Sequence, residues 1–170
     1  MSLRDNIWAT FCNMKYKGYL FELLVSRYQK IDRSVNIFLA VASSTSIAAW
    51  AIWQTLPLLW STIIAISQVV TTIKPYFPYS KIIKELNSRC YKMDLLNIEY
   101  ERFWNKVQRA KLNDDAIEQL YYDHNKTYAE VLNFPDDLVF DTPKTIEDKA
   151  NFKMKNFLKT YYTIQININN

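Results

Sequence analysis

Apolar residues recur at three- and four-residue steps along much of the chain, which is the spacing of one face of an α-helix. The first such stripe spans residues 5–30 and holds Ile7, Phe11, Met14, Phe21, Val25 and Tyr28. The second spans residues 80–111 with heptad spacing and holds Ile83, Leu86, Cys90, Met93, Asn97, Tyr100, Trp104 and Val107. Both stripes predict long amphipathic helices.

The heptad seam in the second stripe predicts helix pairing, because apolar residues at this spacing pack into a facing helix. Its one polar member, Asn97, is typical of residues that set helix register or oligomer number, although a single asparagine in a seam can also be merely tolerated. We predict that the seam joins copies of the chain through Asn97, Tyr100, Trp104 and Val107.

Between the two stripes the chain has no Asp, Glu, Lys, Arg or His for 40 consecutive residues, from Ser34 to Ile73. A membrane-spanning helix takes about 20 apolar residues, so this run has the length of two. Pro57 near its middle disfavours helix at the residue before it. The run predicts a transmembrane hairpin over residues 34–79, with arms at 34–53 and 58–79. The alternative is a helical hairpin buried in a soluble bundle.

Basic residues flank the hairpin on both sides, at Lys30 and Arg33 before it and at Lys74, Lys81 and Lys84 after it. Because positive charge is enriched on the cytoplasmic side of a membrane, both termini are predicted to be cytoplasmic. The apolar stretch begins too late and lacks the small-residue cleavage site of a signal peptide, so no cleavable signal is expected.

Polar residues of the second arm fall on one narrow helical face. A glutamine at mid-membrane depth should face protein or water, which makes Gln68 either a hydrogen-bonding link between helices or part of a pore lining. Two helices cannot enclose a pore, so conduction would require an oligomer. The predicted pore-facing residues are Ser61, Gln68 and Thr72.

The remaining segments complete an all-α membrane protein. Asn113 is a predicted cap for a helix that ends before Pro135, and Thr145 with Asp148 resembles a capping box for a last helix ending near Tyr162. Residues 162–168 then alternate apolar and polar, which predicts a short C-terminal strand or a disordered end. The predicted parts are an amphipathic cytoplasmic helix at 1–33, the hairpin at 34–79 and a cytoplasmic helical domain at 80–170.

Composition excludes several enzyme classes. The chain has one glycine, Gly18, whereas the Rossmann fingerprint, the P-loop and the nucleophile elbow each need at least two. The chain has one histidine and two cysteines, Cys12 and Cys90, which are too few for a zinc site with the usual four Cys and His ligands. So few cysteines also fit a reduced intracellular chain. We therefore expect no catalytic residues, no metal, no cofactor and no enzymatic activity.

Charge is divided into blocks. Residues 1–112 carry 15 basic and 7 acidic side chains, residues 113–148 carry 2 and 10, and residues 149–170 carry 4 and none. Basic residues beside aromatic ones suit nucleotides, because cations hold phosphate while rings stack on bases. Alternatively these cations form a solvated face, pair with the acidic segment, or contact anionic lipid. The predicted nucleotide-binding residues are Arg102, Lys106, Arg109, Lys153 and Lys155.

The order of segments resembles that of the SLATT-type two-transmembrane effectors of prokaryotic antiphage defence. The resemblance covers residues 5–111: an amphipathic N-terminal helix, a tight hairpin at 34–79 and a long helix that follows directly. It implies a protein of the bacterial inner membrane that a nucleotide or oligonucleotide controls, the signal being made by a partner nucleotidyltransferase. It also implies that the protein kills or arrests the infected cell by permeabilising the membrane.

These observations predict an oligomeric membrane effector that forms a gated pore and senses a nucleotide or single-stranded oligonucleotide through its cytoplasmic helices. One alternative is a membrane-anchored helical scaffold that recruits a protein partner through the heptad seam and conducts nothing. Another is a soluble helical interaction module.

Overall fold

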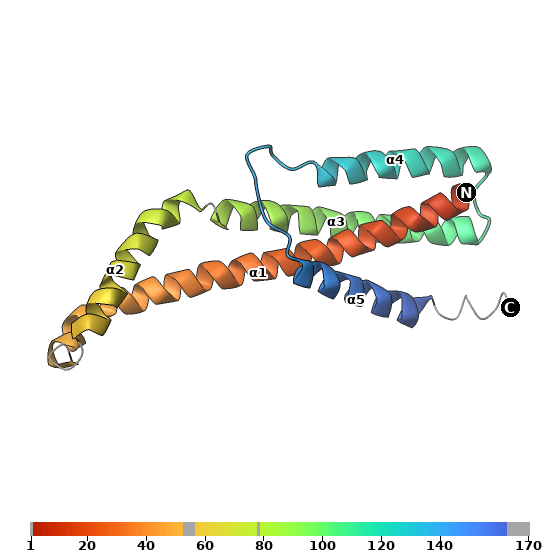
Figure 1. The fold of residues 1–170 in the computed structure, drawn as a ribbon. Coiled ribbons are helices and arrows are strands. Elements are labelled where there is room, and N and C mark those ends of the chain that lie inside the picture. The colour runs from red at the N-terminus through yellow and green to blue at the C-terminus, as the bar shows by residue number, and fades with distance from the viewer. Residues whose placement is uncertain (1, 53–56, 78, 163–170) are drawn as a thin grey trace. The chain divides into compact units, whose positions relative to one another are not determined.

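The computed structural model describes residues 2–52, 57–77 and 79–162, and it describes the side chains of these residues except those of 43–52, 57 and 60. The described residues contain no strand and confirm the predicted all-α class. The predicted C-terminal strand falls almost wholly outside them. The elements, drawn in Figure 1, are α1 (Leu3–Ile52), α2 (Pro57–Ile73), the 3-10 helix η1 (Lys74–Tyr76), α3 (Tyr79–Gln108), α4 (Asp114–Leu132) and α5 (Lys144–Tyr161).

The chain divides into two compact units. The first, called the helical body below, combines residues 1–25 with residues 84–170, and the second, called the hairpin unit, is residues 26–83. The two longest helices, α1 and α3, each contribute residues to both units.

The core of the helical body lies between the first part of α1 and α3. Phe11 and Tyr100 have no exposed surface, and their rings stack with centroids 6.1 Å apart. The Tyr100 hydroxyl donates to the carbonyl oxygen of Ile7 at 3.3 Å, so this polar group is satisfied inside the core. Helical spacing places Ile7, Phe11 and Met14 on one face of α1, where all three are buried.

The heptad seam of α3 therefore packs against a helix of its own chain, in place of the second copy that the sequence analysis expects. Trp8 of α1 lies 5.1 Å from Trp104 between ring centroids, and Arg4 donates to the carbonyl oxygen of Val107 at 3.2 Å. The residues predicted to join copies of the chain are buried in this core: Asn97, Tyr100, Trp104 and Val107. The reason is that the stripe of α1 supplies the apolar partner face that the seam needs.

Two shorter helices cover the α1–α3 pair. α4 runs along α3 (Figure 1). The ring of its His124 lies 5.3 Å from the rings of Tyr100 and Phe103, measured between centroids. α5 lies beside the first part of α1, where Phe157 meets Phe11 at 6.3 Å between centroids. An ion pair of 2.8 Å from Lys153 to Glu22 adds to this contact.

Side-chain caps are predicted at the starts of two helices, and the structure confirms one of them. Asn113 caps α4 as predicted, because its side chain accepts from the backbone N–H of Ala116 at 3.2 Å. The prediction of a capping box at Thr145 is wrong. α5 begins at Lys144 without a side-chain cap, and the carbonyl oxygen of Pro143 accepts instead from the N–H groups of Ile146 and Glu147.

The hairpin unit contains the second part of α1, α2, η1 and the first residues of α3. α2 ends at Ile73, earlier than the predicted end of the second arm at 79, and Pro75 in the following 3-10 turn lacks the N–H that a continued helix would use. Near this point Lys74 donates to the side chain of Asn36. Across the described residues, no helix has both the length and the apolar character needed to cross a membrane.

Candidate functional site

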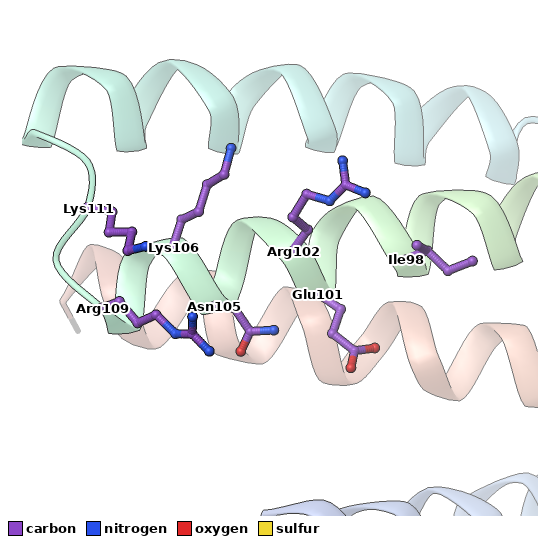
Figure 2. Close-up of a pocket in the computed structure, with 7 residues that line it drawn as sticks. All are labelled: Ile98, Glu101, Arg102, Asn105, Lys106, Arg109 and Lys111. Carbon is purple, nitrogen blue, oxygen red and sulfur yellow. The ribbon is translucent and has the colours of Figure 1, made fainter.

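A hollow of about 600 Å³ lies on the exposed side of α3 near its C-terminal end. Four of its lining side chains are cationic and one is anionic. The lining residues are Ile98, Glu101, Arg102, Asn105, Lys106, Arg109 and Lys111, and Figure 2 shows their side chains.

Helical spacing explains why these residues lie along the same part of α3. Arg102 and Lys106 are four residues apart, and Figure 2 shows both pointing toward α4. Glu101, Asn105 and Arg109 form a second row at the same spacing, which points away from α4. The lining side chains are exposed or half-buried, whereas Tyr100, Trp104 and Val107 of the same helix are buried.

The single carboxylate of the hollow is already paired. Glu101 accepts from the ammonium group of Lys15 on α1 at 3.1 Å, and the Lys15 side chain is the less exposed of the two. This pairing offsets most of the negative charge of Glu101, so the hollow keeps the positive field of its four cations. A field of this kind favours a multiply charged anion.

The fourth cation, Lys111, reaches the hollow because of a left-handed turn that ends α3. Ala110 has a φ of 48°, and its N–H donates to the carbonyl oxygen of Val107 at 3.2 Å. The N–H of Lys111 donates to the carbonyl oxygen of Lys106 at 3.1 Å. This pair of bonds is the Schellman pattern, in which glycine usually takes the left-handed position.

Sequence reasoning found three of the four cations and missed Lys111. Arg102, Lys106 and Arg109 share a helix, so their spacing alone predicts that they lie together. The only sequence signal for Lys111 is a basic residue directly after a predicted helix end, which gives no direction. No glycine marks the turn, since Ala110 occupies its left-handed position.

The other two predicted nucleotide-binding residues do not join this hollow. Lys153 and Lys155 lie on α5, and Lys153 pairs with Glu22 while its ammonium group lies 5.6 Å from the centre of the Tyr19 ring. Lys155 is exposed and does not line the hollow. The structure thus divides the predicted nucleotide surface into a group of cations on α3 and two residues elsewhere.

The predicted pore-facing residues lie on one side of α2, and Ser61, Gln68 and Thr72 are all exposed. Ser61 donates to the carbonyl oxygen of Leu58, and Thr72 donates to that of Gln68. The three other hydroxyl side chains of α2 also donate to carbonyl oxygens of their own helix: Thr62, Ser67 and Thr71. All five hydroxyl groups are therefore satisfied without a partner outside the helix, and the function of the three predicted residues stays a prediction.

The groups that carry nucleophilic or metal chemistry elsewhere are poorly placed for it here. Burial raises the pKa of the Cys12 thiol to about 11, and burial with nearby Asp94 raises that of Cys90. Both thiols are thus protonated at neutral pH, whereas the thiolate is the nucleophile. Within the part of the chain that the structure describes, no group of His, Cys, Asp and Glu side chains is arranged to hold a metal ion.

Comparison of this chain with protein-family models, with curated proteins and with solved structures finds no match.

Proposed function

We propose that this protein is an oligomeric membrane effector whose helical body binds a nucleotide or short single-stranded oligonucleotide in the α3 hollow, and whose hairpin unit carries the response into the membrane. The signal controls a pore that permeabilises the membrane, as in the antiphage effectors that the segment order resembles. The observation that carries this proposal is that Arg102, Lys106, Arg109 and Lys111 line one hollow.

The hollow suits a ligand with phosphate groups better than a ligand with a single carboxylate. Four cations around about 600 Å³ can contact several anionic groups at once, and pockets of about 300 to 1,000 Å³ hold small-molecule ligands. The two guanidinium groups provide paired donors for phosphate oxygens and flat faces for bases. Ile98 lies at the other end of the hollow, and its side chain is more than half exposed. It adds an apolar surface against which a base can pack.

The membrane part of the proposal rests on the whole uncharged run from Ser34 to Ile73, of which the structure describes a part. Of the α2 side chains that are described, none is buried, and Leu58 is 81% exposed. All five α2 hydroxyl groups bond within the helix, which is the arrangement an apolar surrounding demands of polar groups. A lipid surrounding is therefore the environment that suits this helix.

The first test measures nucleotide binding in liposomes that contain the purified full chain. The variant neutralises three cations of the hollow: Arg102→Gln, Lys106→Gln and Arg109→Gln. A matched control removes three exposed lysines elsewhere: Lys84→Gln, Lys92→Gln and Lys155→Gln. Fluorescent 5′-phosphorylated trinucleotides and cyclic mononucleotides are the probes.

We expect the hollow variant to bind the trinucleotide at least about tenfold more weakly, a loss of about 1.4 kcal/mol, while the control binds within about threefold of wild type. Cations near a helix C-terminus also stabilise the helix by about 0.3 to 1 kcal/mol each, so thermal unfolding must show that both variants remain folded. Equal weakening in both variants would mean that diffuse charge, and not the hollow, attracts the probe.

The second test measures ion flux from the same liposomes before and after the nucleotide is added. Gln68→Leu replaces the one amide of α2 with an apolar side chain of similar size, and Ile66→Leu on the same helix is its control. We expect nucleotide-dependent flux in wild type and in the control, and none in Gln68→Leu. Robust incorporation without flux under any addition would reject the pore and leave the membrane-anchored scaffold.

A further inference from the structure

α3 carries a second stripe, called the α3 stripe below, on the side opposite the fully buried Met93 and Tyr100. Alternating steps of four and three residues join its members, which is the spacing of a helix-pairing seam. Its first half is apolar and exposed, and its second half, beside the α3 hollow, is polar and cationic. The members are Tyr91 (66% exposed), Leu95, Ile98 (60% exposed), Arg102, Asn105 and Arg109.

α4 carries an exposed stripe of its own, called the α4 stripe, which is acidic at one end and apolar at the other. Asp115 and Glu118 lie near the start of the helix, Tyr122 follows one turn later with 61% of its surface exposed, and Ala129 is exposed two turns beyond it. The opposite side of α4 packs on α3 of the same chain through His124. The α4 stripe therefore cannot meet the α3 stripe of its own chain.

The two stripes match when α3 of one copy and α4 of another run antiparallel with Tyr122 opposite Ile98. Glu118 precedes Tyr122 by four residues and Arg102 follows Ile98 by four, so both lie about 6 Å along their helices. In an antiparallel pair these two offsets run in the same direction. Glu118 therefore lies opposite Arg102.

The same register gives the other members suitable neighbours. Asp115 lies at the level of Asn105, one turn from Arg109, because each of the two positions is seven residues from the central pair. Ala129 lies at the level of Tyr91 by the same count at the other end, and its small side chain leaves room for the ring. The acidic end thus meets the cationic end, and the apolar end meets the apolar end.

The charged members of both stripes lack partners within one chain. In the part of the chain that the structure describes, none of Arg102, Arg109, Asp115 and Glu118 forms an ion pair. A guanidinium group offers paired donors that match a carboxylate, so the two ends complement each other in shape as well as in charge. Such complementarity selects a partner and fixes its register.

We propose that the α3 stripe of one copy binds the α4 stripe of a second copy of this chain, antiparallel and in this register. Each chain presents both stripes, so the contact repeats from copy to copy and builds a ring or a filament. It differs from the contact that the heptad seam predicts, because the seam residues are buried within one chain.

The contact has a consequence for the α3 hollow. Arg102 and Arg109 belong to the α3 stripe and also line the hollow. A phosphorylated ligand in the hollow and the carboxylates of a neighbouring copy need the same cations, so they exclude each other. This consequence rests on the proposed function, whereas the contact itself does not.

Disulfide cross-linking of the full chain in detergent tests the contact, in a background of Cys12→Ser and Cys90→Ser. One population carries Tyr91→Cys, the other carries Ala129→Cys and a size tag, and the two are mixed under mild oxidation. We expect mixed dimers, and about tenfold fewer dimers from either population alone, because only the mixture brings the two sulfur atoms within bonding distance. Lys155→Cys, exposed on α5, replaces the first population as a control and should give no mixed dimer.

Charge reversal tests the register. Arg102→Glu with Arg109→Glu in the first population places like charges opposite each other, and the yield of mixed dimer should fall at least about tenfold. Asp115→Lys with Glu118→Lys in the second population makes the ends complementary again and should recover most of the yield. Recovery also shows that both reversed variants are folded.

The matched control reverses two exposed lysines of α5, Lys149→Glu and Lys155→Glu, in the first population. It makes the same change in net charge away from the α3 stripe. The yield should stay within about twofold of the unreversed pair, since long-range repulsion between exposed charges is screened by salt.

A 5′-phosphorylated trinucleotide tests the consequence for the hollow. At saturating concentration it should lower the yield of the unreversed pair and leave that of the charge-reversed pair unchanged. Binding without a fall in yield would show that ligand and neighbour do not share the cations. Absence of binding would reject the proposed nucleotide site, while the cross-link would still report the contact.

Three results would overturn the contact. The first is the absence of mixed dimers. The second is cross-linking of Tyr91→Cys with itself as efficiently as with Ala129→Cys, which would assign the α3 stripe to a symmetric contact between two α3 helices. The third is a yield that charge reversal on the α3 stripe leaves unchanged.

Discussion

The helices α2 and α3 differ both in apolar content and in burial, and the two differences run in opposite directions. α2 carries no charged residue, and none of its described side chains is buried. α3 carries ten charged side chains, yet most of its heptad seam lies in the core of the helical body. The more apolar helix is therefore the less buried one.

Burial therefore depends on a facing element and not on apolar content alone. α3 finds a matching stripe on α1, so Met93 and Tyr100 lose all contact with solvent. No element of the chain covers the described side chains of α2 in this way. At least half of the surface is exposed at each of Leu59, Ile66 and Val69. Exposed apolar surface on this scale marks a site of contact with membrane or with another protein.

The largest expected effect comes from the same substitution made in both regions. Ile7→Ala removes a side chain with no exposed surface in the helical body, and we expect a loss of about 2 to 5 kcal/mol of unfolding free energy. Ile66→Ala removes a side chain that is 50% exposed on α2, and we expect a loss below about 1 kcal/mol. Denaturant unfolding of the full chain in detergent measures both.

Equal losses at the two positions would contradict the difference in burial between Ile7 and Ile66. They would show that Ile66 is covered as fully as Ile7 in the assembled protein, by another copy of the chain. A small loss at both positions would instead show that the α1–α3 core contributes little to stability, contrary to the burial of Ile7.

A smaller effect of opposite sign is expected where α3 ends. Ala110 holds a φ of 48°, which costs a residue with a Cβ atom about 1 kcal/mol, so Ala110→Gly should stabilise the helical body by about 1 kcal/mol. The control is Ala129→Gly on the exposed side of α4, which should destabilise by up to about 1 kcal/mol. Thermal unfolding distinguishes the two signs, and a destabilising Ala110→Gly would contradict the left-handed turn.

Sequence periodicity predicted the elements that depend on local spacing. The stripes of residues 5–30 and 80–111 lie in α1 and α3, and Asn113 caps α4 as predicted. The same spacing brings Arg102, Lys106 and Arg109 to one hollow. Each of these features is decided within a few turns of one helix, so the order of residues contains the information.

The rest depended on contacts between distant segments. Nothing in the heptad seam says whether its partner is a copy of the chain or α1, because both present apolar stripes. The approach of Gly18 to Asn97 joins positions 79 residues apart, and it appears only when α1 and α3 are packed together. Lys153 was grouped with the α3 cations by composition, whereas the packing of α5 on α1 brings it to Glu22.

The smallest expected effect is a pH dependence of stability, which we assign to His124 of the helical body. Residues 34–73 contain no Asp, Glu, Lys, Arg or His, and the one histidine of the chain, His124, lies against Tyr100 and Phe103 in the body. Burial lowers the pKa of His124 below its usual 6.5, and this outweighs the opposing effect of Glu99 and Asp123.

Because the folded pKa is the lower one, the unfolded chain takes up a proton first as the pH falls through about 6.5. The contribution of His124 to stability is therefore complete above that pH and declines below it, toward the folded pKa. We expect wild type to unfold at lower denaturant concentration at pH 5.5 than at pH 7.5, and His124→Gln to lose most of this difference. An undiminished difference in His124→Gln would place the titrating group elsewhere, and a difference of opposite sign would mean that the folded chain holds the charged imidazole more tightly than the unfolded one.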